Sequence, residues 1–404
     1  MKTVGIIAEY NPFHNGHCYQ LKQAREMSGA DFVIVVMSGD FTQRGTPALL
    51  DKYARCEMAL HSGADLVIEL PVCYATGSAE YFAKGAVSIL EGLQTDALCF
   101  GSECGEIEPL CATARILSEE PEAFKQALSE NLRKGMSFPA ARSLAMGEKG
   151  TLLQTPNNIL GIEYIKALYR LGSTMEVHTT KRIGAGYLDA SLSGSFCSAL
   201  AIRQHIYDKA DIAALTSYMP KSALHILERE LLISSPVSIE DFSSMLFYRL
   251  LSLQEEGYTA FADVTQALSD KISRLVTEYS SYSVFCGDLL KSKDLTHARI
   301  SRSLLHILLS VKKEDMDIFS AAGNAQYARI LGFKEASRGI FGILKNSPLP
   351  LISKLADAHT KLSPAGMRQL KQDIFAAHLY DSIAAQKTGS PIQNEYRRQI
   401  VILP

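Results

Sequence analysis

The chain has 404 residues, which is too long for one ordinary hydrophobic core, so we expect two globular domains. Hydrophobic residues make up 47% and charged residues 21% of the sequence, a composition that excludes a disordered or fibrous protein. The formal net charge of −2 excludes a uniformly basic nucleic-acid-binding protein, so any contact with nucleic acid must come from a local patch.

Short apolar strands alternate with helices in the first half of the chain. Strands are predicted at residues 2–8, 31–38, 64–70 and 96–100, with helices at 15–28, 50–62 and 82–92 between them. A mostly helical stretch at 107–171, a last strand at 174–178 and a helix at 198–206 follow. This alternation predicts a parallel sheet with right-handed crossovers, which is a doubly wound, Rossmann-like α/β fold. We expect this domain to span residues 1–205.

The second half, residues 206–404, loses the strand-like pattern and is predicted to be a mainly α-helical C-terminal domain. Amphipathic helical segments cover 239–253, 261–278 and 300–311, and the tail from residue 386 onward is predicted to be irregular. A helical half of this size favours a macromolecular substrate over a small one.

Eight cysteines occur without a CxxC pair or a regular spacing, which favours reduced thiols over disulfides or structural zinc. No stretch approaches the roughly 18 to 20 consecutive apolar residues that span a bilayer, and the N-terminus becomes polar too soon for a secretory signal. We therefore expect a cytoplasmic protein without a membrane contact.

The first predicted strand runs directly into the motif NPFHNGH at residues 11–17. Ligands of an open parallel sheet bind beyond the carboxyl ends of its strands, so the motif lies where this fold places a site. His14 and His17, three residues apart at a helix start, project to one side of the helix, and Gly16 lets a nucleotide approach the backbone. A helix N-terminus also favours phosphate. The motif therefore predicts a polyphosphate cradle.

His14 and His17 are the candidate catalytic residues. When pyrophosphate leaves the α-phosphate of a nucleotide, imidazole N–H groups and a helix N-terminus can stabilise the developing charge without a covalent intermediate. The predicted role is therefore electrostatic and not nucleophilic. The alternative interpretation is that both are ordinary loop histidines, one of which caps the helix while the other is partly buried.

A strand followed by Asn-Pro-Phe-His-x-Gly-His resembles the HIGH superfamily of adenylyltransferases and class I aminoacyl-tRNA synthetases. Further segments make the chain similar to the bacterial tRNA(Met) cytidine acetate ligase family over nearly its whole length; they are residues 38–45, 69–71, 100–103, 157–161 and 181–187. The resemblance implies that ATP and acetate form acetyl-adenylate, whose acetyl group is transferred to N4 of the wobble cytidine (C34) of elongator tRNA(Met), giving N4-acetylcytidine. It also implies Mg²⁺ as a cofactor, no metal ligand in the protein and no stable protein partner.

Two other functions stay open at the sequence level. A small-metabolite adenylyltransferase would share the cradle, but it usually needs no helical half of this size. A non-catalytic ATP- or RNA-binding protein would also keep the cradle, although the intact pair His14 and His17 argues against a decayed site.

The resemblance implies a set of ATP contacts in the loop and first helix, in two later strand ends and at a later helix. These are Ile7, Ala8, Glu9, Tyr10, Asn11, Pro12, Phe13, His14, Asn15, Gly16, His17, Cys18, Tyr19, Gln20, Gly101, Asn157 and Arg182, and Asn158 could replace Asn157. Residues 197–203 resemble the superfamily's Ser/Thr-rich turn, in which the Ser198 hydroxyl and the Arg203 guanidinium suit the β- and γ-phosphates. Cys197 and Leu200 depart from that pattern, and Arg203 could instead be an ordinary arginine that closes a helix.

Two further groups of charged residues are candidates for substrate contact. Asp40, Gln43, Arg44, Lys52 and Arg55 follow the second strand and could form an acetate and tRNA face, or a solvated loop and helix. The stretch between residues 291 and 313 contains six Lys or Arg residues and one Asp. The tRNA-binding candidates in it are Lys291, Lys293, Arg299 and Arg302. In this interpretation Leu304, Leu305, Leu308 and Leu309 pack inward, and the alternative is a solvated helix face.

Overall fold

The computed structural model describes residues 1–182, 197–208, 210–291 and 295–404 of the chain. Within these ranges eight strands form one sheet in the order β5-β4-β1-β2-β3-β6-β7. The eighth strand, β8, also pairs with β6, at residues 332–334, whereas β7 pairs with it at residues 328–329. The first five strands are parallel: β1 (Thr3–Ala8), β2 (Phe32–Ser38), β3 (Leu66–Leu70), β4 (Ala97–Ser102) and β5 (Glu176–Lys181). The predicted doubly wound α/β fold is confirmed.

Both faces of the sheet are buried, which explains why its strands are apolar throughout. On β2, Val33 and Val35 point into one core and Ile34 and Val36 into the other, because successive side chains alternate across a sheet. The helices α1 (Asn15–Ser28), α2 (Lys52–His61), α9 (Ala199–Tyr207) and α10 (Lys221–Ile233) cover the first face. The short α3 (Val72–Ala75), α4 (Ala79–Gly92) and α8 (Pro156–Leu171) cover the other face.

The order of the strands fixes where a ligand can enter. The chain runs from β1 to β2 and β3 on one side, and then returns to place β4 and β5 on the other side of β1. The crossover helices therefore leave the sheet in opposite directions at β1 and β4, which opens a crevice at the carboxyl ends of these two strands.

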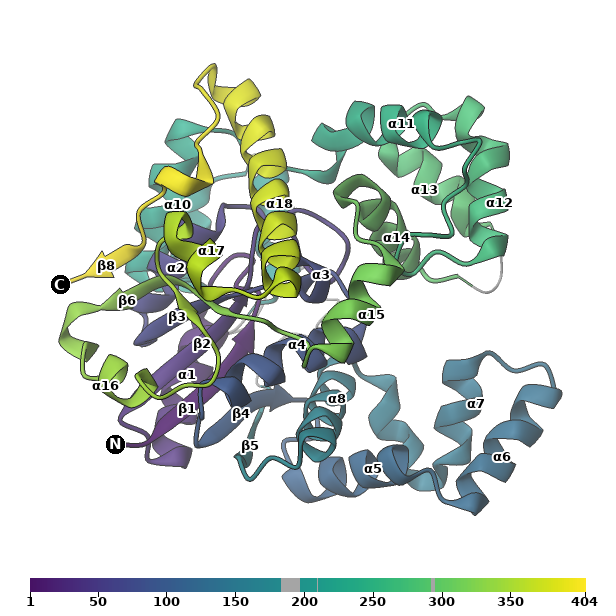
Figure 1. Cartoon of the computed structure of the whole chain (residues 1–404), viewed down its shortest axis with the longest axis horizontal. Helices are drawn as coiled ribbons and strands as arrows, with labels where there is room; N and C mark the ends of the chain where they lie inside the picture. Colours follow the sequence, from purple (N-terminus) through teal and green to yellow (C-terminus); the bar gives the residue numbers. More distant parts are fainter. Residues whose placement is uncertain (183–196, 209, 292–294) are drawn as a thin grey trace.

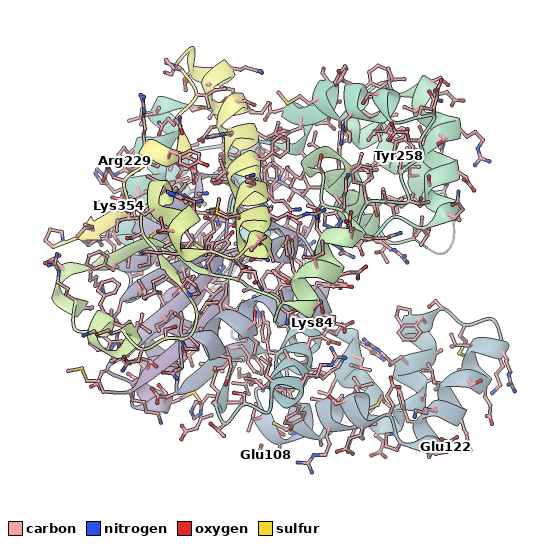
Figure 2. The ribbon with its side chains drawn as sticks, viewed as in Figure 1. Lys84, Glu108, Glu122, Arg229, Tyr258 and Lys354 are labelled. Atoms are coloured by element: carbon pink, nitrogen blue, oxygen red, sulfur yellow. The ribbon has the colours of Figure 1, made fainter. Side chains whose placement is uncertain are left out.

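Two helical lobes extend from the same side of the sheet (Figure 1). One lobe consists of α5 (Ile107–Glu119), α6 (Glu122–Arg133) and α7 (Phe138–Ala145). The other contains α11 (Ser243–Ser252), α12 (Gln266–Leu275), α13 (Tyr282–Leu290) and α14 (His297–Leu309), and α15 (Lys313–Ala321) leads from it back toward the sheet. Tyr258, labelled in Figure 2, is buried in this second lobe and donates its hydroxyl hydrogen to the Leu250 carbonyl oxygen at 2.7 Å. No helix in the described ranges is long and apolar enough to cross a membrane.

The C-terminal part departs from the prediction at its end. Helices dominate as predicted as far as residue 321, but β6 (Ala328–Lys334) pairs antiparallel with β3, and β7 (Leu351–Ile352) and β8 (Val401–Leu403) join it. The prediction of an irregular tail is wrong at β8, because the edge of β6 provides backbone partners that local patterns do not reveal. The long α18 (Pro364–Thr388) packs on α3, while the short α16 (Ile340–Leu344) and α17 (Ala358–Lys361) lie in the connections. The domain boundary at residue 205 stays a prediction.

Candidate active site

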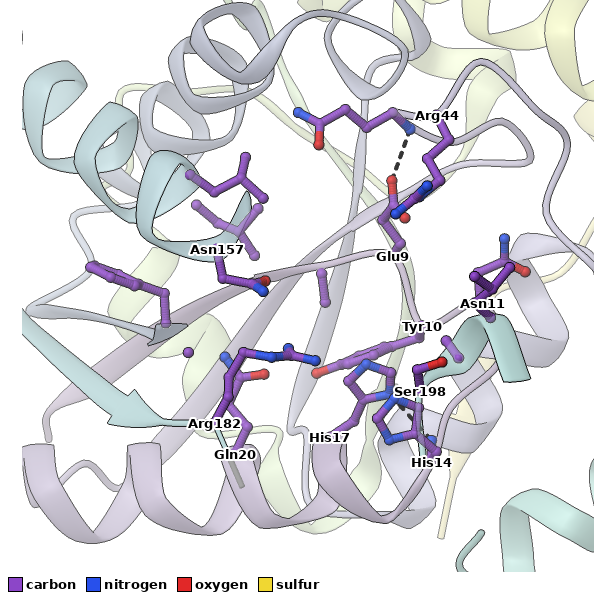
Figure 3. Close-up of a pocket in the computed structure, with 18 of the residues that line it drawn as sticks. Glu9, Tyr10, Asn11, His14, His17, Gln20, Arg44, Asn157, Arg182 and Ser198 are labelled. Atoms are coloured by element: carbon purple, nitrogen blue, oxygen red, sulfur yellow. Dashed lines mark hydrogen bonds between the residues drawn. The ribbon is translucent and has the colours of Figure 1, made fainter. Parts of the chain in front are cut away.

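A cleft opens at the carboxyl ends of β1 and β4, where the strand order reverses (Figure 3). It encloses about 990 Å³ including its open mouth. The α1 and α9 side contributes His14, His17, Gln20, Ser198 and Arg203, while α4 and α8 contribute apolar residues and Asn157. A smaller pocket beside it is lined by Gly16, Tyr19, Thr180, Lys181 and Cys197, together with residues shared with the cleft.

The two motif histidines are held by the start of α1. His14 is the N-cap residue, and its Nδ1 accepts the Gly16 N–H at 3.0 Å. The Nδ1 of His17 accepts the His14 N–H at 3.2 Å, and the two rings stack with their centroids 3.7 Å apart. Since both Nδ1 atoms are acceptors, the hydrogen of each neutral ring is on Nε2. Each imidazole can therefore donate an Nε2–H hydrogen bond.

Electrostatics keep both rings neutral. Burial lowers the pKa of His14 to about 3, with further lowering by the cationic Arg182 and Arg203. The pKa of His17 lies well below its ordinary value, because packing beside Tyr10 and Phe13 removes water from the ring and His14 and Arg182 disfavour a positive charge. Neutral donors in a partly dry cleft suit an anionic ligand.

The loop between β1 and α1 is fixed from several directions. Tyr10 has a backbone φ of +48°, and its buried ring packs at 4.8 Å from both the Phe13 and the His17 ring centroids. The side-chain oxygen of Asn11 accepts the Leu49 N–H at 2.8 Å, and its carbonyl oxygen accepts from Arg203 at 2.5 Å. This loop therefore presents its groups to the cleft in one defined arrangement.

Ser198 and Arg203 belong to α9, whose N-terminus faces the cleft. The Ser198 hydroxyl caps that helix by accepting the Ala201 N–H at 3.0 Å. Both residues line the cleft, and Ser198 lies on the same side as the two histidines in Figure 3. Two helix N-termini, α1 and α9, thus meet at the place where the sequence predicted phosphate.

Glu9 and Arg44 lie on the other side of the cleft (Figure 3). The Oε1 atom of Glu9 accepts the Gln43 N–H at 2.8 Å. The buried Arg55 donates to the Glu9 carbonyl oxygen at 2.7 Å and to the Ser38 carbonyl oxygen at 3.0 Å. The ends of β1 and β2 are therefore tied together beneath this side.

Most predicted ATP-site residues lie in the two pockets, and four do not. Those in contact with the pockets are Ile7, Ala8, Glu9, Tyr10, Asn11, His14, Gly16, His17, Tyr19, Gln20, Gly101, Asn157, Arg182, Ser198 and Arg203. Pro12, Phe13, Asn15 and Cys18 support the loop from behind: Phe13 is fully buried, for example, and Asn15 bonds to the Ser217 carbonyl oxygen at 2.9 Å.

The structure separates Asn157 from Asn158. Asn157 lines the cleft, and its amide donates to Glu103 Oε1 at 2.7 Å. Asn158 is buried, and its side-chain oxygen accepts the N–H groups of Glu103 and Cys104 at 3.0 and 3.2 Å. Asn158 therefore supports the loop after β4, while Asn157 faces the cleft.

Sequence reasoning did not identify the apolar wall of the cleft. Phe82 from α4, Phe100 from β4, and Leu160 and Tyr164 from α8 form this wall. Each of them reads as an ordinary core residue, and only the packing of α4 beside α8 brings them to the same cavity. Phe100 and Leu160 lie in segments that carry the family resemblance, but no local signal in the sequence distinguishes Phe82 and Tyr164 from the rest of the core.

Three of the loop-side candidates are corrected by the structure. Lys52 and Arg55 were expected on a substrate face or a solvated helix, but both are fully buried. Lys52 forms ion pairs with Glu69 at 2.8 Å and with Glu395 at 2.5 Å. The reason is that α2 lies flat on the sheet and the C-terminal turn at residues 395–397 covers its start. Asp40 is also buried, so Gln43 and Arg44 alone of this group line the cleft.

The predicted tRNA-binding residues surround the start of α14. Lys291 is exposed and paired with Asp288 at 2.7 Å, Arg299 is half-buried, and Arg302 is paired with Asp263 at 2.8 Å. Lys293 lies outside the described residues. Leu304, Leu305, Leu308 and Leu309 are buried, as predicted. Gly45 touches α14 so closely that a Cβ on it would collide with the Arg302 backbone nitrogen, so this helix abuts the loop that carries Arg44.

No cluster of three or more potential metal ligands occurs in the described ranges. Glu9 is the only carboxylate among the described residues that line the cleft. The described cleft therefore offers a metal ion one carboxylate and not a cage of ligands.

Comparison with known proteins agrees with this geometry. The family model described as HIGH Nucleotidyl Transferase matches residues 1–395. A protein of Acetivibrio thermocellus named tRNA(Met) cytidine acetate ligase is 40% identical over 418 residues and is covered completely, as is this chain. A protein of the same name from Caldanaerobacter subterraneus is 43% identical over 389 residues, which cover 94% of this chain and 95% of that protein.

Two crystal structures of Thermotoga maritima TmcAL superpose on the whole chain, and each is itself covered completely. The apo form has a TM-score of 0.93 at 34% identity, and the form bound with α-thio ATP has a TM-score of 0.92 at 33% identity. The resemblance found in the sequence is confirmed: the chain is a ligase that belongs to the tRNA(Met) cytidine acetate ligase family of HIGH nucleotidyl transferases.

Proposed function

We propose that this ligase joins acetate to ATP as acetyl-adenylate and then transfers the acetyl group to N4 of the wobble cytidine, C34, of elongator tRNA(Met), giving N4-acetylcytidine. The observation that carries the proposal is the pair of neutral histidines, His14 and His17, whose Nε2–H groups are available at the strand-order reversal. The related T. maritima protein was crystallised with α-thio ATP, which supports nucleotide binding here.

In the first step an acetate oxygen attacks the α-phosphorus, and the bond from that phosphorus to the bridging oxygen breaks. Pyrophosphate leaves with the electron pair. Negative charge grows on the phosphate oxygens during this step, and the Nε2–H donors of His14 and His17 offset it together with the N-terminus of α1. Removing one donor of this kind from an active site typically costs about 100- to 1,000-fold in rate.

The β- and γ-phosphates fit the neighbouring end of α9. Ser198, which caps this helix, lies on the same side of the cleft as the histidines, and the Arg203 guanidinium is close enough to His14 to lower its pKa. Arg182 adds a positive charge close enough to lower the pKa values of both histidines. These groups hold the leaving pyrophosphate in line with the attacking oxygen.

Mg²⁺ fits this cleft as an ion carried by the nucleotide. Mg²⁺ typically keeps several waters and binds mainly through substrate phosphates, so the described lining does not need to supply a cage of ligands. It would supply positive charge to the leaving pyrophosphate.

The helical lobe supports a tRNA substrate through its position. The start of α14, with Arg299 and Arg302, lies against the loop that carries Arg44 into the cleft. A phosphate backbone bound along α14 would therefore bring a nucleotide to the open side of the cleft, away from the histidines. The names of the curated relatives point to the same substrate.

The test incubates the purified chain with ATP, Mg²⁺, labelled acetate and bulk bacterial tRNA, followed by nucleoside analysis. We expect label in N4-acetylcytidine with the wild-type chain and none with the His14→Ala/His17→Ala variant. Pyrophosphate without labelled tRNA would identify a different acyl acceptor. ATP binding with neither product would refute the ligase reaction for this chain.

A further inference from the structure

The cleft has two chemically different sides. His14, His17, Arg182 and Arg203 give the first side hydrogen-bond donors and positive charge, which suits the triphosphate. Glu9 and Arg44 lie on the second side. The apolar wall of Phe82, Phe100, Leu160 and Tyr164 lines the same cleft. Figure 3 shows Glu9 and Arg44 on one side and the two histidines on the other, with the Tyr10 ring between them. The second side has no evident use in binding the phosphates.

Transfer of an acetyl group to an amine releases a proton, and few groups in the cleft can accept it. The histidines are unsuited because their Nδ1 atoms already accept backbone N–H groups and their pKa values are lowered. The Tyr10 hydroxyl is buried, and burial raises its pKa. Among the described residues that line the cleft, Glu9 is the one carboxylate.

The Glu9 side chain is held in place for such a role. Its Oε1 accepts the Gln43 N–H at 2.8 Å, and its backbone carbonyl oxygen accepts from Arg55 at 2.7 Å. No described residue donates a hydrogen bond to its Oε2, and the side chain is half-buried at the cleft wall. One oxygen is therefore anchored, while the other accepts no hydrogen bond from a described residue.

We propose that the second side of the cleft receives the acceptor cytosine and that Glu9 is a catalytic residue which binds its N4 amino group and takes its proton. This rests on the proposed function, which supplies the cytidine acceptor. A carboxylate is the natural partner of the cytosine N4–H group. The Arg44 guanidinium donates to the acceptor atoms N3 and O2 on the same edge, and the apolar wall covers the face of the ring.

The transfer step balances with these groups. The N4 nitrogen attacks the acyl carbon of acetyl-adenylate, forming the N–C bond, and the bond from that carbon to the phosphate oxygen breaks. AMP leaves with the electron pair, and one N4 hydrogen passes as a proton to Oε2 of Glu9 and from there to water. The α14 side, where the tRNA is proposed to bind, and the second side of the cleft are connected by the loop of Arg44 and Gly45.

The test separates activation of acetate from transfer. Hydroxylamine traps acetyl-adenylate as acetohydroxamate without needing an enzymic base, so it reports the first step alone. In Glu9→Gln we expect hydroxamate formation and tRNA affinity within about threefold of wild type, while acetylation of tRNA in a single turnover falls by about 100-fold, a typical general-base effect. Glu9→Asp, which keeps a carboxylate, should recover part of that loss. Glu26→Gln on the exposed surface of α1 is the matched control and should behave as wild type.

Each other result has a defined meaning. Equal losses of hydroxamate and acetylcytidine in Glu9→Gln would place its side chain in the ATP site and overturn the inference. Unchanged acetylation, or a loss explained by weaker tRNA binding, would also overturn it. Failure of the proposed function looks different, because the wild-type chain would then form neither hydroxamate nor acetylcytidine.

Discussion

The histidine side of the cleft and the start of α14 are both proposed to bind phosphate groups, but they are built differently. His14 and His17 are oriented by backbone N–H groups two or three residues away. The basic side chains near α14 are instead partly neutralised by acidic ones, as Arg302 is by Asp263 from a segment 39 residues earlier. The first region acts through neutral donors in fixed positions, and the second through charges that a polyanion must draw away from existing partners.

This difference teaches which parts of a site a local motif can determine. A helix N-terminus and its capping side chains form a self-contained unit, so its geometry follows from a few consecutive residues. The net charge of a surface helix depends on every element packed beside it. We therefore expect changes at the first region to affect one chemical step strongly, and changes at the second to affect tRNA binding moderately.

The largest effect in this comparison is predicted for Arg203. Replacement by Ala removes a donor to the proposed phosphates and the bond to the Asn11 carbonyl oxygen that helps to hold the motif loop. We expect kcat/KM for ATP in acetate-dependent pyrophosphate release to fall by about 100-fold, as expected for a charged hydrogen bond of roughly 1.5 to 3 kcal/mol. In Arg203→Lys, which keeps the positive charge but not the forked pair of donors, kcat/KM for ATP should fall less. Unchanged affinity for tRNA in both variants would mean that Arg203 acts on ATP and not on tRNA binding. A parallel loss of tRNA affinity would mean that the two regions do not act independently.

A smaller effect of the opposite kind is predicted for α14. Arg299→Ala/Arg302→Ala should weaken tRNA binding by about 10-fold at low salt and reduce the salt slope by about 1 for each phosphate that is no longer neutralised, while hydroxamate formation stays unchanged. Arg229→Ala is the matched control, since Arg229 is an exposed, ion-paired arginine on α10. Filter binding at several salt concentrations measures both quantities. Wild-type tRNA affinity in the double variant would mean that these arginines belong to a solvated helix face that does not bind tRNA.

The same contrast explains what the sequence could predict. The strand, turn and helix around His14 were predicted together, because apolar β1, the motif and the start of α1 are local and agree with each other. The choice between Asn157 and Asn158 required the position of Glu103, which binds both residues from the loop after β4. The sequence could name the pair but not the member that faces the cleft.

Errors appeared where distant segments meet. Lys52 lies on a helix whose start is covered by Glu395, more than 300 residues later, so its burial could not follow from its neighbours in the chain. The strand β6 was missed for a related reason. Its segment, ARILGFK, is a short apolar run interrupted by Arg329 and ended by Lys334, which fits a buried helix as well as a strand, and only the free edge of β3 decides between them.

The smallest predicted effect is the dependence of stability on pH that His14 contributes. The folded-state pKa of His14 is about 3, whereas an unfolded histidine titrates near 6.5. Below pH 6.5 the unfolded chain binds a proton that the folded chain does not, so this contribution to the free energy of unfolding is present at neutral pH and falls as the pH drops from about 6.5 toward 3. Each pH unit in that range removes about 1.4 kcal/mol.

Between pH 7 and pH 5.5 the wild type should therefore lose about 1 kcal/mol more than His14→Asn, in which asparagine can still cap α1 without titrating. Urea unfolding of both proteins at the two pH values measures the difference, and carboxylates elsewhere cancel because both proteins share them. Parallel wild-type and His14→Asn curves would mean that His14 is solvated in the native protein, and the contrast between the two regions would then be lost.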